Sequence, residues 1–90
     1  MATIITYDIP SKHREFKQKM FEIGYKQVFK DAKGIDVNLP NTTLLHQTKN
    51  SENALNDARQ TCFALNISLE RCILSQFGPD WSGIYGVPLN

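Results

Sequence analysis

The chain has 90 residues, a net charge of +1 and a hydrophobic fraction of 41%. This length holds one small domain with a modest core, and the composition excludes an intrinsically disordered chain. No apolar run approaches the roughly 20 residues that cross a membrane, and no secretory leader is evident, so we expect a cytoplasmic protein without membrane contact. The two cysteines, Cys62 and Cys72, are too few for a disulfide scaffold, and we expect both to pack as reduced thiols.

The amino-terminal third predicts a strand followed by a helix. Residues Ala2–Tyr7 form a short β-branched and aromatic run, which is typical of a buried strand. Pro10 cannot continue a strand ladder and Ser11 is a suitable N-cap, so we expect a helix over Ser11–Ile23 that stops at Gly24. The apolar stripe of this helix consists of Phe16, Met20 and Ile23.

The middle of the chain predicts two further strands. Residues Tyr25–Ala32 are expected to form the second strand, which ends at the turn Lys33-Gly34. Residues Ile35–Pro40 are expected to be irregular, and Thr42–Gln47 are expected to form the third strand.

The carboxy-terminal half predicts a helix, a strand and a tail. The helix begins within Thr48–Ser51 and ends near Asn66, a residue that tolerates the left-handed conformation of a helix stop. Its apolar face consists of Leu55, Ala58, Cys62 and Leu65. A fourth strand is expected over Ser68–Phe77, and a glycine- and proline-containing tail follows from about residue 78.

This order of elements predicts an α+β fold over a single domain of residues 1–90. Strand, helix, strand, strand, helix, strand is the pattern of the ferredoxin-like βαββαβ sandwich, a four-stranded antiparallel sheet with two helices on one face. The first strand is central in that topology, so Asp8 is expected at the end of a central strand. The sheet face without helices must meet water or a partner, and apolar residues on that face favour a homodimer.

Basic residues are concentrated in one segment. Residues 10–30 contain six basic and two acidic side chains, a net charge of +4. The pattern is compatible with a solvated helix face or with a surface that contacts the phosphates of RNA or DNA. The six candidate nucleic-acid-binding residues are Lys12, Arg14, Lys17, Lys19, Lys26 and Lys30.

With the elements in place, most of the chain resembles a known group of proteins. The run Ile4–Pro10 is similar to the start of the CRISPR-associated protein two superfamily and its VapD-like relatives. The segments Asn41–His46 and Leu69–Gly86 resemble the SinR-like branch of that superfamily. In the second of these segments the resemblance rests on Gly78, Trp81, Gly83 and Gly86.

The resemblance implies a ferredoxin-like homodimer, with metal-dependent nuclease activity in its active members. Asp8 matches the strand-one aspartate of the superfamily. The resemblance therefore implies a catalytic role for Asp8 and, with its copy across the dimer axis, a site for Mg²⁺ or Mn²⁺. The alternative from the residues themselves is a strand-end turn, in which the Asp8 side chain accepts hydrogen bonds from the backbone near Pro10 and Ser11.

Two functions are therefore open. The first is a small homodimeric nucleic-acid-associated protein, either a vestigial or a metal-dependent nuclease. The second is a non-catalytic interaction module or regulator, of the defence or toxin–antitoxin type, that binds a partner protein through Trp81–Val87. Near-neutral charge favours the second, as does Phe29-Lys30-Asp31 where the superfamily has a Phe-Glu signature. His13 and His46 are each a candidate general acid or base, or else a surface histidine.

Overall fold

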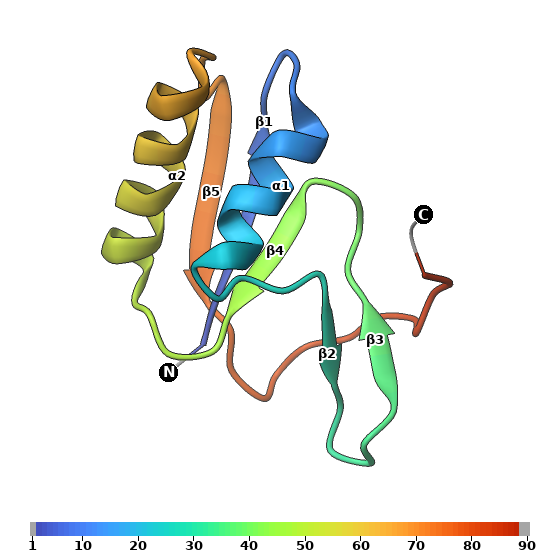
Figure 1. The fold of residues 1–90 in the computed structure, drawn as a ribbon. Helices are drawn as coiled ribbons and strands as arrows, with labels where there is room; N and C mark the ends of the chain where they lie inside the picture. Colours follow the sequence, from blue (N-terminus) through green and yellow to red (C-terminus); the bar gives the residue numbers. More distant parts are fainter. Residues whose placement is uncertain (1, 89–90) are drawn as a thin grey trace.

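The computed structural model describes residues 2–88 and shows a mixed α+β fold (Figure 1). Two helices and a three-stranded antiparallel sheet form its main body, and a separate two-stranded sheet stands beside it. In chain order the elements are β1 (Thr3–Asp8), α1 (His13–Glu22), β2 (Val28–Lys30), β3 (Asp36–Asn38), β4 (Thr43–His46), α2 (Ser51–Leu65) and β5 (Arg71–Gln76). No helix within residues 2–88 is long and apolar enough to cross a bilayer.

The main sheet has β1 at its centre, as the sequence predicted. Its order is β4-β1-β5, and both neighbours run antiparallel to β1. Ile5 lies opposite Leu44 on one side and opposite Leu74 on the other, so apolar side chains meet across the middle of the sheet. Asp8, the last residue of β1, lies opposite Arg71.

The predicted four-stranded sheet is wrong for the described residues. Within residues 2–88, the segment expected to form the second strand pairs with the main sheet only at Lys26, which makes an isolated bridge with Leu45. The chain then leaves the sheet, and β2 pairs instead with β3 in a hairpin. The hairpin is favoured because Phe29 of β2 packs against Phe77 and Trp81, which lie beyond β5. The same pairing corrects the expectation that residues 35–40 are irregular.

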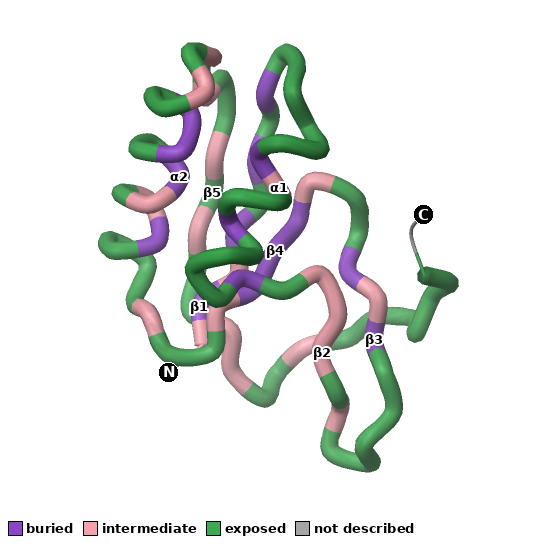
Figure 2. Tube along the Cα trace, in the orientation of Figure 1, coloured by how far each residue is buried: buried purple, intermediate pink, exposed green. Residues whose placement is uncertain are grey.

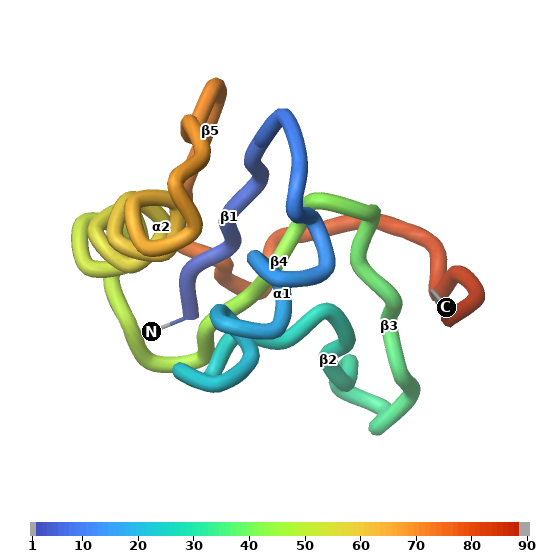
Figure 3. The backbone as a smooth tube through the Cα atoms, turned by 45° about the horizontal axis from the view of Figure 1, so that its top comes forward, coloured from blue at the N-terminus to red at the C-terminus, as the bar shows by residue number. Residues whose placement is uncertain are grey.

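Both helices cover the same face of the main sheet. Along β1, Thr3, Ile5 and Tyr7 are buried, whereas Thr6 and Asp8 are exposed (Figure 2). The buried residues that pack with Ile5 and Tyr7 come from both helices, β4 and the α1–β2 connection: Phe16, Met20, Tyr25, Leu44, Ala54, Ala58 and Cys62. Each large apolar side chain in this cluster stabilises the fold by about 1.5–3 kcal/mol. The helices therefore lie together on one side of the strands (Figures 1 and 3).

The two helices end differently from one another. The side chain of Asn50 caps α2 by accepting a hydrogen bond from the Asn53 amide at 2.8 Å, and Asn66 ends α2 in the left-handed conformation, which confirms the predicted stop. The predicted Ser11 cap of α1 is wrong, because Lys12 takes that position without a side-chain cap. Ile23, predicted in the buried stripe, follows the last residue of α1 and is exposed.

Candidate functional site

Asp8, the predicted catalytic residue, forms an ion pair at the end of β1. Arg71 Nε lies 2.6 Å from Asp8 Oδ2, and both side chains are largely open to solvent. The pair follows from the sheet register, because Asp8 and Arg71 are opposite each other on the same face. The carboxylate also raises the pKa of the Arg71 guanidinium above its ordinary value. The Asp8 side chain therefore accepts a hydrogen bond from an arginine. The alternative that we drew from the sequence was a strand-end turn, in which Asp8 would accept hydrogen bonds from the backbone.

A cation at Asp8 would have to compete with this arginine. Residues 2–88 contain no cluster of three or more His, Cys, Asp or Glu side chains that could hold a metal ion. Asp8 of one chain supplies a single carboxylate. The remaining ligands would come from Asp8 of a second copy, from water and from substrate phosphates. A divalent cation at Asp8 would therefore need most of its ligands from outside this chain.

The six candidate nucleic-acid-binding residues are divided between two parts of the fold. Lys12, Arg14, Lys17 and Lys19 belong to α1 and its cap, whereas Lys26 and Lys30 belong to the β2 segment. Three of them are engaged within the chain. Lys12 Nζ donates to the carbonyl of Leu65 at 2.8 Å, Lys17 Nζ donates to the Asn41 side chain, and Lys30 Nζ lies 2.7 Å from Asp36 Oδ1. Partial burial lowers the pKa of Lys17.

The two histidines occupy unlike positions. His13 is exposed at the first residue of α1. His46 Nδ1 accepts hydrogen bonds from the amides of Thr48 and Lys49, each at 3.2 Å, and Nε2 lies 3.2 Å from the carbonyl of Ile23. These partners require the proton on Nε2. Both ring nitrogens of His46 are therefore committed to holding the backbone, and the ring is not placed as a general acid or base.

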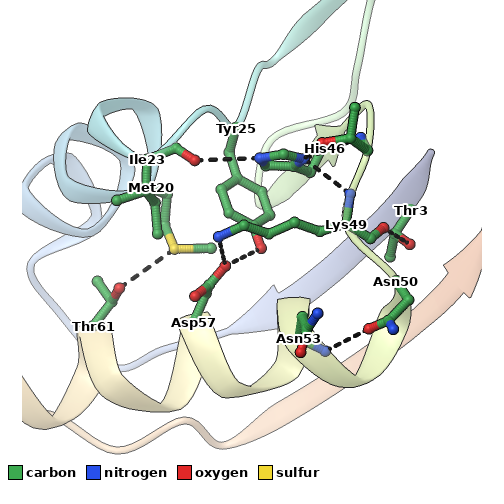
Figure 4. Close-up of polar contacts among 11 residues, drawn as sticks. Thr3, Met20, Ile23, Tyr25, His46, Lys49, Asn50, Asn53, Asp57 and Thr61 are labelled. Carbon is green, nitrogen blue, oxygen red and sulfur yellow. Dashed lines mark hydrogen bonds and ion pairs between the residues drawn. The ribbon is translucent and has the colours of Figure 1, made fainter. Parts of the chain in front are cut away.

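A polar cluster that sequence reasoning missed surrounds His46 (Figure 4). Tyr25 Oη donates to Asp57 Oδ2 at 2.8 Å, and Lys49 Nζ lies 2.6 Å from the same oxygen. The His46 ring meets the edge of the Tyr25 ring, with centroids 4.9 Å apart. Burial, followed by the bond to Asp57, raises the pKa of Tyr25. We name Tyr25, His46, Lys49 and Asp57 the Tyr25 cluster.

The Tyr25 cluster is a structural clamp. Its four side chains come from the α1–β2 connection, β4, the β4–α2 connection and α2, so the cluster ties these segments together. Each of the four side chains has a hydrogen-bond or ion-pair partner, and the Lys49 carbonyl also accepts a hydrogen bond from the Thr3 hydroxyl at 2.7 Å. No local sequence signal could have found it, because the four residues are dispersed over 33 positions of the sequence. A fully paired polar cluster of this kind rigidifies the fold.

The sheet face opposite the helices carries a second apolar cluster. The rings of Phe29, Phe77 and Trp81 pack with centroid separations of 5.2–6.1 Å. These rings and Ile4 line an apolar cavity of about 350 Å³ beneath the C-terminal segment. Trp81 thus anchors this segment, which we define as residues 78–88, to the chain's own sheet.

The C-terminal segment is fixed at a second point, beside β3. The Asn38 amide donates to the carbonyl of Tyr85 at 2.8 Å, and Tyr85 Oη donates to Asp31 Oδ2 at 3.1 Å. The amides of Ile35 and Lys33 also donate to Asp31, and the bond from Ile35 contributes most to lowering its pKa. Ile84 and Val87 nevertheless remain 84% and 79% exposed. The segment therefore presents apolar side chains on a backbone that is held in place.

The cysteines lie near one another but are free thiols in the structure. Cys62 is buried and Cys72 is half-buried. Burial raises the pKa of both thiols, so neither has the character of an activated nucleophile.

No protein-family model matches this sequence, and a search of curated proteins found no match.

Proposed function

We propose that this protein is a non-catalytic protein-interaction domain whose C-terminal segment binds a partner protein. The observation that carries the proposal is the exposure of Ile84 and Val87 on a segment anchored by Trp81 and Tyr85. Apolar side chains that stay exposed on a fixed backbone bind a partner at low entropic cost, because the backbone is already ordered. The neutralised Asp8 and the fully paired Tyr25 cluster support a role without catalysis.

The matched test replaces the two exposed apolar residues without touching the anchors. Ile84→Asp with Val87→Asp should abolish binding to the natural partner, whereas Ser82→Asp, at an exposed polar position of the same segment, should leave it intact. Truncation after Gly78 should have the same effect as the double variant. Binding can be followed by quantitative affinity purification from the native host, with thermal unfolding to show that each variant is folded. Equal recovery of every bound protein with the wild type and the double variant would reject the proposal.

A second candidate function is association with nucleic acid, and one feature favours it. Lys26 and Lys30 line an open pocket of about 460 Å³ together with Phe29 and Phe77. Lysines beside aromatic rings suit the backbone and bases of a single strand. Lys26→Glu should then weaken binding to labelled single-stranded RNA or DNA far more than Lys19→Glu. Binding that does not change with salt concentration would contradict phosphate contacts at this pocket.

A further inference from the structure

The two edges of the main sheet are completed differently. At the β4 edge, Lys26 and Leu45 exchange two backbone hydrogen bonds of 2.8 Å, so part of that edge is covered. At the other edge no strand in the described part of the chain pairs with the outer side of β5. Edge strands are commonly protected by proline, by charge or by short length. β5 has six residues, Arg-Cys-Ile-Leu-Ser-Gln, without proline, and its one charge is neutralised by Asp8.

The backbone of β5 shows which groups face outward. The amide of Phe77 donates to the carbonyl of Ala2 at 2.8 Å. Because successive residues of an antiparallel strand bond to opposite sides, Ser75, Ile73 and Arg71 also turn their backbone groups toward β1. The N–H and C=O groups of Cys72 and Leu74 therefore point away from the sheet. They form a template for one more strand.

Exposed apolar side chains lie on both faces of the sheet along this edge, among the polar groups of Arg59, Glu70, Arg71 and Ser75. On the helix side, α2 and β5 enclose a groove of about 510 Å³ that Leu55, Cys62, Ile67, Leu69 and Cys72 line. Phe63 also lines this groove and is 89% exposed. On the opposite face, Ile73 is 70% exposed. Phe63 and Ile73 supply exposed apolar side chains at the centre of this open strand edge, and the charged side chains around them are of the kind found at an interface rim.

We propose that a second copy of this chain pairs with β5 in antiparallel orientation, across a two-fold axis at Ile73, to give a continuous six-stranded sheet. In this register Cys72 of each copy exchanges backbone hydrogen bonds with Leu74 of the other, and the two Ile73 side chains face each other. Arg71 lies opposite Ser75, so the like charges are kept apart. The surface is self-complementary, since each copy brings both a groove and the exposed Phe63 to the same edge. This contact uses a different surface from the C-terminal segment and does not depend on the proposed function.

Cysteine crosslinking tests the register directly. Ile73 bonds to β1, so it would form a non-hydrogen-bonded pair with its copy, at a Cα separation of about 4.5 Å. That separation permits a disulfide, for which the Cα atoms lie roughly 4.4–6.8 Å apart. Two Ser75 residues would lie roughly 13 Å apart in the same register, four residues along the strand. In a Cys72→Ser background, Ile73→Cys should therefore form a covalent dimer under mild oxidation, whereas Ser75→Cys, on the same face, should not.

Sedimentation equilibrium supplies the second measurement. The wild type should show a concentration-dependent dimer, and Ile73→Lys should reduce self-association at least tenfold. Because Ile73 is exposed, this variant should keep the circular dichroism spectrum of the wild type. Ser75→Glu, which places an acid opposite Arg71 of the second copy, should leave the dimer intact. A wild type that stays monomeric at all concentrations would overturn the proposal, as would a dimer that survives Ile73→Lys or faster crosslinking at Ser75→Cys. The double variant Ile84→Asp with Val87→Asp, in which Trp81 and Tyr85 are kept, should form the same dimer, so the outcome is independent of partner binding by the C-terminal segment.

Discussion

At the scale of single residues, two buried tyrosines differ in whether the phenolic hydroxyl has a hydrogen-bond partner. Tyr7 and Tyr25 are both almost fully buried in the core cluster. The hydroxyl of Tyr25 donates to Asp57, whereas the hydroxyl of Tyr7 has no hydrogen-bond partner among residues 2–88. A buried polar group without a partner costs about 1–3 kcal/mol, and a bond to a charged group contributes roughly 1.5–3 kcal/mol. The same substitution should therefore act in opposite directions at the two positions.

We predict that Tyr7→Phe raises the free energy of unfolding by about 1 kcal/mol and that Tyr25→Phe lowers it by about 1–2 kcal/mol. Urea denaturation of the two variants and the wild type measures both effects. Each variant serves as the control for the other, because both lose one phenolic oxygen from a buried ring. A loss of stability in Tyr7→Phe would contradict an unpartnered hydroxyl.

At the scale of elements, the sequence predicted those parts of the fold that local patterns determine. Asn66 ends α2 because asparagine tolerates the left-handed conformation, and the alternation along β1 specifies which face is buried. The hairpin could not be predicted in the same way. β2 and β3 have three residues each, and Phe29 is held by Phe77 and Trp81, which lie about 50 residues further along the chain. Pairing of such short strands depends on tertiary contacts that no local window contains.

The connection between α1 and β2 depends on a glycine. Gly24 has φ +101°, and a Cβ atom at this position would lie 2.8 Å from His46 Nε2 in the Tyr25 cluster. Gly34 in the β2–β3 turn also has a positive φ, +80°, but a Cβ atom there would meet nothing within 4 Å. Alanine in the left-handed region costs about 1–2 kcal/mol from backbone strain alone. Gly34→Ala isolates this strain, and Gly24→Ala adds a steric conflict to it.

We predict that Gly24→Ala lowers the free energy of unfolding by about 1–3 kcal/mol more than Gly34→Ala does, because His46 must also move. Denaturation of both variants gives the difference. In Gly24→Ala, the NMR resonances of the His46 ring should shift, whereas Gly34→Ala should leave them unchanged. Equal losses of stability would show that His46 makes room without cost.

At the scale of the whole molecule, the sequence located Asp8 but not its partner. The run Tyr7-Asp8-Ile9-Pro10 correctly predicted an acid at the end of a central strand. Arg71 is 63 residues away and reaches Asp8 only through the antiparallel pairing of β1 with β5. The register between β1 and β5 determines which charged side chains are opposite each other. A shift of this register by one residue would move Arg71 to the other face of the sheet. The sequence therefore could not distinguish a lone carboxylate from an ion pair.

Global stability should respond to alkaline pH through the core tyrosines. Burial raises the pKa of both Tyr7 and Tyr25 above the ordinary value of 10.0. Above that pH the unfolded chain loses two phenolic protons that the folded chain retains, so the unfolded state binds fewer protons and stability falls as pH rises. Below pH 10 this contribution is fully present.

We predict that the free energy of unfolding declines above about pH 10 by roughly 1.4 kcal/mol per pH unit for each of these tyrosines. Tyr7→Phe and Tyr25→Phe should each remove about half of the slope that the two core tyrosines contribute. The double variant should remove that whole contribution and leave only the contribution of Tyr85, whose pKa is raised by its hydrogen bond to Asp31. Urea denaturation across the alkaline range measures the slopes, and comparison among the variants cancels the titration of lysines because every lysine is unchanged. Close packing of both rings in the core, against residues of α1, α2 and β4, should keep their phenolic protons bound in the folded chain. Parallel slopes in the wild type and the double variant would contradict this prediction, because the folded core would then release these protons as readily as the unfolded chain.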